Sequence, residues 1–206
     1  MSENSSSVSP STSFIQAARR GQLVECAIEV IAEVGLARAS TVRIARRAGV
    51  SRGVLTYHFR DRAELIEQVI ARVYELGGEF LLPRMGRAAS PRESMMIFIG
   101  GSVELYAAHP VHMAALTAIF AAGPTDAGVE RARLQRHSQE MLDLSRILHE
   151  GQERGQFRDF DVGVMARTIR GALDGAVAHI ANGGDVEPYA SELQAIFDAA
   201  TAVAKV

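Results

Sequence analysis

The most constraining feature of the chain is the stretch RIARRAGVSRGVLTYHFRDRAEL, residues 43–65, in which two short apolar-periodic runs flank a break at residues 48–51. Gly49 lies in that break, and a positive φ angle costs little only for glycine. The spacing therefore predicts one short helix over 41–48 and a second over 51–58, joined by a tight turn. Two short helices joined in this way form a helix-turn-helix motif.

Helical spacing also dominates the rest of the 206 residues, and Gly, Pro and capping residues interrupt it. The chain has only six prolines, and it shows no alternating strand pattern and no internal repeat. We therefore predict an all-α protein with about nine helices. The expected segments are 17–34, 41–48, 51–58, 61–82, 91–108, 110–122, 126–151, 161–181 and 188–203.

The first residues and the cysteine content indicate where such a chain resides. Residues 1–12 are rich in serine and lack the apolar run of a signal peptide, so we expect a disordered tail. The single cysteine, Cys26, excludes an intrachain disulfide framework and is compatible with a reducing compartment. No stretch reaches the ~18–20 apolar residues that a membrane span needs. We expect a soluble, cytoplasmic protein.

Charge is distributed unevenly along a chain whose net charge is only −2. Residues 1–62 contain nine arginines and five acidic residues, whereas residues 63–206 carry an excess of acids. A basic first third on an acidic remainder predicts two parts with different partners, and local positive charge is typical of nucleic-acid binding.

The predicted second helix of the motif suits a DNA major groove. Leu55 and Phe59 face inward, which leaves the other side of the helix for contacts with bases. Arg52 is placed to donate two hydrogen bonds to guanine, and Gly53 allows a close approach to the groove floor. The alternative is that this basic corner is only structural, as in many helical proteins that do not bind DNA.

The stretch from Leu23 to Ile70 resembles the N-terminal domain of the tetracycline-repressor (TetR) family of bacterial transcription regulators. The similarity rests on AIEVIAEVGLARAST, IARRAGVSRGVLTYHF and RDRAEL. The resemblance implies a DNA-binding domain over 13–60, a helical effector-binding and dimerisation domain over 61–206, and a homodimer on a palindromic operator. It also implies a repressor released by a small molecule, and it implies no cofactor.

The DNA-contacting residues expected from the helix geometry, the positive charge and the resemblance together lie in the motif and directly after it. They are Thr41, Arg43, Arg46, Arg47, Ser51, Arg52, Gly53, Thr56, Tyr57, His58 and Arg62. The family commonly has an aromatic residue where this chain has Thr56, so the base preference at that position departs from the usual pattern.

The last two predicted helices carry a wide apolar stripe, and the resemblance implies that they form a four-helix dimer interface. The residues expected there are Ile169, Ala172, Leu173, Ala176, Val177, Ile180, Leu193, Ile196 and Phe197. Gly171 and Gly175 lie four residues apart and permit close helix approach. Packing within one protomer is the alternative for the same stripe.

A pocket for a largely apolar effector is expected among the helices of 61–151, where methionine and aromatic side chains recur. The candidate lining residues are Phe80, Met95, Met96, Phe98, Ile99, Tyr106, Met113, Phe120 and Met141. Residues of these types at helical spacing are also typical of an ordinary core. Gly77 and Gly78 are adjacent within a predicted helix, which suggests a bend or hinge there.

Catalytic and metal-binding patterns are missing from the sequence. His109 and His112 are three residues apart, but Pro110 interrupts the helix between them and no cysteine is near. We find no nucleophile elbow, phosphate-binding loop or zinc-protease motif, so we expect neither an enzyme nor a metal site. The function predicted is a ligand-responsive DNA-binding regulator, and the alternative is a helical small-molecule binding protein without a DNA function.

Overall fold

The computed structural model describes residues 10–123 and 127–204, and within these residues the fold is entirely helical, with nine α-helices and one 3-10 turn. The predicted fold class and helix number are thus confirmed. The elements are α1 (Pro10–Val34), η1 (Leu36–Arg38), α2 (Thr41–Arg47), α3 (Arg52–His58), α4 (Arg62–Met85), α5 (Pro91–Ala108), α6 (Pro110–Ala121), α7 (Ala127–Glu153), α8 (Val162–Ala181) and α9 (Val186–Thr201).

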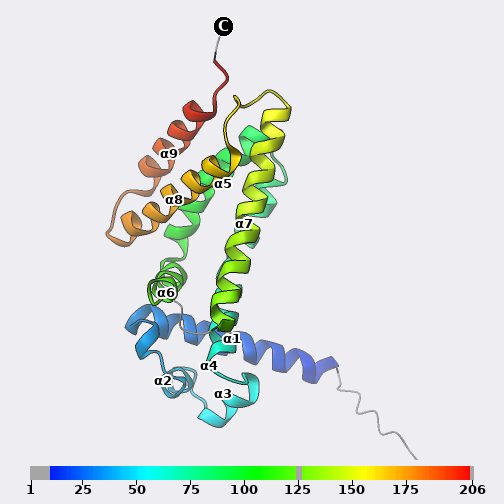
Figure 1. Ribbon diagram of the computed structural model, residues 1–206. Coiled ribbons are helices and arrows are strands. Elements are labelled where there is room, and N and C mark those ends of the chain that lie inside the picture. The colour runs from blue at the N-terminus through cyan, green and yellow to red at the C-terminus, as the bar shows by residue number, and fades with distance from the viewer. Residues whose placement is uncertain (1–9, 124–126, 205–206) are drawn as a thin grey trace, which may run out of the picture.

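The molecule is elongated, with α1, α2 and α3 at one end and α5, α7, α8 and α9 extending towards the other (Figure 1). Helix α4 starts beside α3 and runs into the larger helical part, where it packs against α5 and α7. Helix α6 packs mainly against α1, which makes it a second link between the two ends. None of the helices in the described ranges is long and apolar enough to cross a membrane.

A small apolar core holds the first three helices together. Ile28 and Ile31 of α1, Ile44 of α2 and Leu55 of α3 are all almost fully buried. Helix α4 contributes Leu65 to the same buried set, so the start of α4, which was expected to belong to the second domain, packs with the first three helices.

Helix boundaries differ from the predictions at three places. Helix α1 begins at Pro10, so residues 10–12 of the expected disordered tail are helical, while the rest of that tail lies outside the described residues. Helix α4 continues past Pro83, because a proline in the last turn removes one N–H donor without ending the helix before Gly86. Helix α9 begins two residues before Pro188, which the structure accommodates in the first turn.

Candidate DNA-binding surface and effector cavity

The helix-turn-helix corner has the local geometry that its sequence predicts. The Ser40 and Ser51 hydroxyls cap α2 and α3 by accepting hydrogen bonds from the N–H groups of the third residues beyond them. Gly49 has a φ of 66°, a left-handed conformation that glycine adopts without a Cβ clash. The N–H of Val50 then donates to the carbonyl of Ala45 at 3.0 Å, which closes the turn.

Helix α3 has one buried and one exposed face. Leu55 and the adjoining Phe59 are each only 1 % exposed and fix the helix on the core. The opposite side presents Arg52, Gly53 and Thr56, all exposed, and Tyr57 with 72 % of its surface exposed. These are residues that the sequence predicts to read DNA. This exposed side of α3 is accessible to a binding partner, and an α-helix fits the major groove of DNA.

Three polar groups on α3 have intramolecular partners that the sequence did not suggest. The Thr56 hydroxyl donates to the carbonyls of Arg52 and Gly53, at 3.2 and 3.1 Å, so it is turned towards its own helix. The Tyr57 hydroxyl accepts a hydrogen bond of 3.2 Å from the side-chain amide of Gln16. The His58 carbonyl accepts a hydrogen bond from Arg20.

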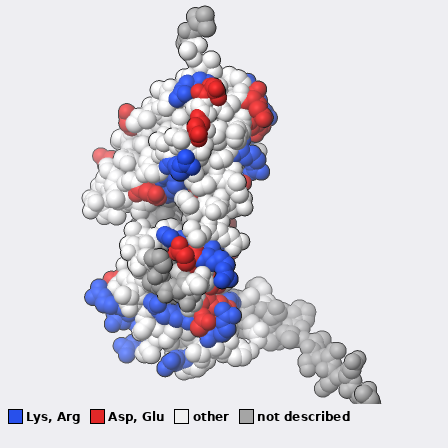
Figure 2. Space-filling model, in the orientation of Figure 1, with Lys and Arg blue, Asp and Glu red and all other residues white. Residues whose placement is uncertain are grey.

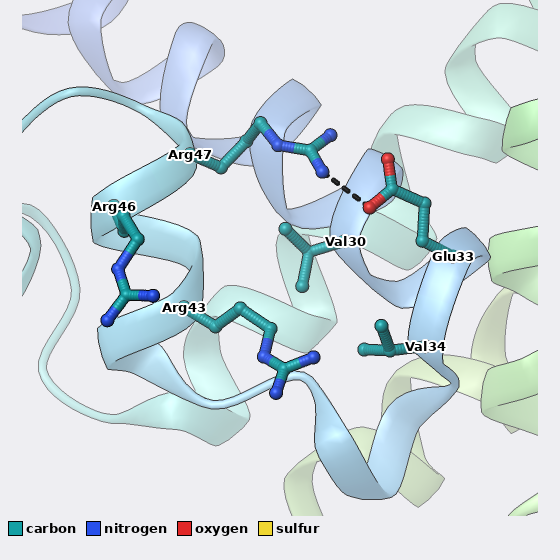
Figure 3. Close-up of a pocket in the computed structure, with 6 residues that line it drawn as sticks. All are labelled: Val30, Glu33, Val34, Arg43, Arg46 and Arg47. Atoms are coloured by element: carbon teal, nitrogen blue, oxygen red, sulfur yellow. Dashed lines mark hydrogen bonds and ion pairs between the residues drawn. The ribbon is translucent and has the colours of Figure 1, made fainter.

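The arginines of α2 are not equivalent. Arg43 and Arg46 are exposed, and neither side chain has an ion-pair partner within the described ranges. Arg47 instead pairs with Glu29 at 2.9 Å and with Glu33 on α1 (Figure 3). The hydrogen bonds with these carboxylates raise the pKa of Arg47 above its ordinary value, and those from Arg47 lower the pKa of Glu33.

An open cavity of about 490 Å³ lies between α1 and α2, lined by Val30, Glu33, Val34 and the three arginines of α2. Figure 3 shows Arg47 reaching across it to Glu33, with the Arg43 and Arg46 guanidinium groups left unpaired. Of the expected phosphate contacts on α2, the structure leaves these two available and engages Arg47 internally. Figure 2 shows further basic side chains over this end of the molecule.

Arg62, also predicted to meet a phosphate, is placed as an internal clamp. Its guanidinium donates to the carbonyl of Leu36 and, at 3.3 Å, to the carbonyl of Ala39. Both residues belong to the segment that enters α2, and both are buried. Arg62 therefore ties the first turn of α4 to the start of the helix-turn-helix motif.

Arg20 on α1 has a comparable role that the sequence analysis missed. It donates to the His58 carbonyl and to Glu64, the latter at 2.7 Å, and its guanidinium lies 4.3 Å above the Phe59 ring. These partners are 38 to 44 residues away in the sequence. The spacing of residues along the chain does not indicate such a contact, because it depends on how α1, α3 and α4 pack together.

Glu25 links the two ends of the molecule. Its carboxylate accepts hydrogen bonds from Arg72 of α4 and lies next to His112 of α6, each at 3.1 Å. His109 and His112 also contact each other edge to face, with ring centroids 5.7 Å apart. A movement of α4 or α6 would therefore change the contacts of Glu25 on α1, and α1 packs against α2 of the helix-turn-helix motif.

A large cavity of about 1080 Å³ is enclosed by residues of α4, α5, α6, α7 and α8. Four of the predicted lining residues do border it, namely Phe98, Tyr106, Met113 and Phe120. Five others do not, namely Phe80, Met95, Met96, Ile99 and Met141.

The side of α5 on which each residue lies explains which of the predicted residues border the cavity. Residues 98, 102, 105 and 106 face the cavity, whereas Met95 and Ile99 lie on another side of the helix and are fully buried in the core. Phe80 contacts His109 and Arg84 instead, and Met96 and Met141 pack against the core.

One end of the cavity contains a charged and aromatic cluster that the sequence analysis did not identify. Arg170 of α8 donates to Glu140 at 2.9 Å and to Asp174 at 2.6 Å. The Arg170 and Glu140 side chains are only 16 % and 21 % exposed. Tyr74 and Tyr106 complete the cluster, and burial raises the pKa of both phenols.

Gly77 and Gly78, expected to form a hinge, lie within one uninterrupted helix and border the cavity. A methyl group at Gly77 would meet the Leu105 side chain at 3.5 Å, which is an ordinary contact. The two glycines therefore leave room in the cavity wall.

Gly77→Ala is accordingly expected to raise the free energy of unfolding by up to about 1 kcal/mol, because alanine favours the helix interior. Urea unfolding at a fixed protein concentration measures this change, with Gly78→Ala as a second variant that also has room for its methyl group. A loss of stability in both variants would contradict the conclusion that each position has room for a methyl group.

The residues predicted for a dimer interface divide between the core and the surface. Ile169, Leu173, Ala176 and Phe197 are buried within the protomer, Ala172, Val177, Ile180 and Leu193 are half-buried, and Ile196 is exposed. A different stripe of α8 is exposed and consists of small or apolar residues. Its members are Val164, Thr168, Gly171, Gly175 and Ala178.

An exposed helix presented on a helix-turn-helix corner, together with a separate helical part, is the arrangement of helix-turn-helix transcription regulators. Residues 23–69 match the sequence model of a family described as "Bacterial regulatory proteins, tetR family". This match places the N-terminal part of the chain in the TetR family of transcriptional regulators.

Two similar curated relatives are transcriptional regulators called BetI. One, BetI 1 of Chromohalobacter salexigens, is 36% identical over 91 residues, covering 44% of this chain and 45% of the relative. The chain thus matches less than half of that relative's length. The other, from Escherichia coli strain SMS-3-5, is 27% identical over 167 residues, which cover 78% of this chain and 86% of the relative.

Solved structures share the fold at low sequence identity. The ketosteroid transcriptional regulator KstR2 of Mycobacterium tuberculosis has a TM-score of 0.73 at 23% identity, covering 90% of this chain and 96% of its own. A transcriptional regulator from Saccharomonospora viridis in complex with choline has a TM-score of 0.77 at 18% identity, covering 91% and 100%. FadR from Bacillus subtilis in complex with stearoyl-CoA has a TM-score of 0.76 at 19% identity, covering 85% and 96%.

Proposed function

We propose that the protein is a cytoplasmic repressor that binds a palindromic operator as a homodimer and releases it when a small molecule occupies the cavity between α4 and α8. The observation that carries the proposal is the exposed face of α3, held on the core by two buried side chains and flanked by the unpaired Arg43 and Arg46. Relatives that bind choline or stearoyl-CoA support an effector role for the cavity.

In this proposal α3 enters the major groove, and Arg52 at its first turn reads a base by two hydrogen bonds. Gly53 keeps the helix close to the groove floor. Arg43 and Arg46 face phosphates and supply affinity that does not depend on sequence. Thr56 contacts the DNA only if its hydroxyl exchanges its bond to the helix backbone for one to a base.

The exposed small-residue stripe of α8, with Ile196 of α9, is proposed as the surface that meets the second protomer. Gly171 and Gly175 are exposed and allow the two copies of α8 to approach closely. The dimer then holds two α3 helices about one turn of DNA apart, ~34–36 Å.

Release follows if the effector binds better to a conformation with a different separation of the two α3 helices. The operator affinity then falls by the difference in effector binding free energy between the two conformations. Helix α4 borders the cavity and is clamped to the entrance of α2 by Arg62, and Glu25 connects α4 and α6 with α1. These contacts support a mechanical route from the cavity to the DNA-binding end.

Arg52→Ala is expected to weaken binding to the operator by about 1–3 kcal/mol while leaving binding to unrelated DNA nearly unchanged. Arg43→Ala is expected to weaken binding to both and to reduce the magnitude of the slope of log K against log salt by about one. Fluorescence anisotropy across a salt series on the DNA flanking the protein's own gene measures both effects.

Arg146→Ala is the matched control, because Arg146 is an exposed arginine of α7 that pairs with Asp143, away from α2 and α3. Its affinity and salt slope should equal those of the unmodified protein. If Arg52→Ala and Arg43→Ala also behave like this control, the helix-turn-helix corner has no DNA role and the chain acts as a small-molecule binding protein.

A further inference from the structure

The chemistry of the cavity wall restricts the molecules that it can hold. Most of the wall is apolar, with Leu105, Met113, Leu116 and Phe120 facing the space from α5 and α6. Hydrogen-bonding groups gather at the end formed by α4, α7 and α8. A ligand that fits both regions has a long apolar part and one polar end.

The charges at the polar end are already matched to one another. Arg170 directs its Nε and Nη2 to Asp174 and its Nη1 to Glu140, so one cation serves two carboxylates. The cluster therefore carries a surplus of negative charge. An anionic head group placed against this cluster would meet the two carboxylates, and Arg170, the one cation of the cluster, is already paired with them.

A cationic head group is also disfavoured. The Arg170 guanidinium lies between the carboxylates and offers a like charge to an incoming cation. A second cation there would lie against the Arg170 guanidinium, and the Arg170 side chain is only 16 % exposed, so water would screen the repulsion between the two cations poorly.

Tyr74 supplies a neutral polar group beside this cluster. It is half-buried, it borders the cavity, and its hydroxyl has no hydrogen-bond partner among the residues that the structure describes. Burial, reinforced by Glu140, raises the pKa of Tyr74, so the phenol stays protonated at neutral pH and can donate a hydrogen bond.

We propose that the effector is an uncharged, largely apolar molecule whose hydroxyl or carbonyl oxygen accepts a hydrogen bond from Tyr74. This inference rests on the proposed function only in taking the cavity as the effector site. The apolar part of the molecule lies along the α5 and α6 wall.

Three probes with the same ten-carbon chain test the class directly: 1-decanol, decanoate and decyltrimethylammonium, each titrated into the full chain below its micelle concentration. Isothermal calorimetry is expected to give the tightest binding for decanol. Tighter binding of decanoate or of the ammonium compound would overturn the proposal. So would the absence of binding by all three.

Tyr74→Phe isolates the hydrogen bond because it keeps the ring. The affinity for decanol is expected to fall about fivefold, the effect of losing one neutral hydrogen bond, and the affinity for the two charged probes is expected to stay the same. Tyr189→Phe is the control, since Tyr189 stacks on His179 and does not border the cavity. Equal decanol affinity in both variants would refute a role for the Tyr74 hydroxyl.

Operator binding by the same protein samples separates this inference from the proposed function. Retained operator binding together with the wrong probe order shows that only the effector class is wrong. If the unmodified protein does not bind operator DNA, the proposed DNA function is wrong, whichever probe binds.

Discussion

Arg170→Met is expected to lower the free energy of unfolding by about 3 kcal/mol, because it leaves Glu140 unpaired at a mostly buried site. The Arg170 side chain is 16 % exposed and the Glu140 side chain 21 % exposed, so water replaces the lost partner only in part. The value lies at the low end of the range for broken buried pairs, since Asp174 is mostly exposed and regains solvent.

Urea unfolding at equal protein concentration measures this loss. Arg146→Met is the control and should change stability by less than about 0.5 kcal/mol, because its ion pair with Asp143 lies at the surface. The double variant Arg170→Met with Glu140→Leu should recover at least half of the loss, since it removes the unpaired charge as well. A single variant as stable as the control would contradict the account of a matched charge cluster.

Arg62→Ala is expected to lower the free energy of unfolding by about 3 kcal/mol and to weaken binding to every DNA sequence. Two hydrogen bonds from a charged group are lost, and the buried carbonyls of Leu36 and Ala39 lose their guanidinium donor. The entrance to α2 then loses its attachment to α4, so the position of α3 relative to the rest of the molecule is no longer held.

Arg60→Ala is the matched control for Arg62, because Arg60 is an exposed neighbour that pairs with Asp61 at the surface. It should leave the free energy of unfolding nearly unchanged. A simple phosphate contact at Arg62 would predict the reverse pattern: normal stability with a reduced salt slope of DNA binding. That result would show that Arg62 acts on DNA and not as an internal clamp.

The features of the fold that were predictable from sequence are the local ones. The left-handed turn at Gly49 depends on neighbouring residues and is found where the sequence predicts a tight turn, and serines at the predicted helix starts, Ser40 and Ser51, cap α2 and α3. The passage of α4 beyond Pro83 was not predictable, because a proline near a helix end costs too little to decide the boundary against the surrounding packing.

The partners of charged side chains were much harder to predict. Arg47, Arg62 and Arg20 are surface-type residues in a basic stretch, and sequence spacing alone indicates that such residues face solvent or DNA. Each instead finds a partner 14 to 44 residues away. The roles of Arg20 and Arg47 emerge only from the packing of α1 with its neighbouring helices, and that of Arg62 from the packing of α4 against the segment that enters α2.

The cavity shows the same limit. The sequence indicated that aromatic and methionine residues of α5 would line a pocket, but not which side of the helix faces it. Tyr74, Arg170 and Glu140, which set the polarity of the cavity, lie on three different helices. Only their assembly at one end of the space identifies the kind of ligand expected there.

The central claim is that two copies of α3 read DNA together, and selection of duplexes from a random library by the purified full chain tests it most directly. The account predicts enrichment of inverted repeats whose half-site centres lie about 10–10.5 base pairs apart, or a multiple of that distance. Enrichment of isolated, asymmetric sites, or no enrichment above unselected DNA, would contradict it.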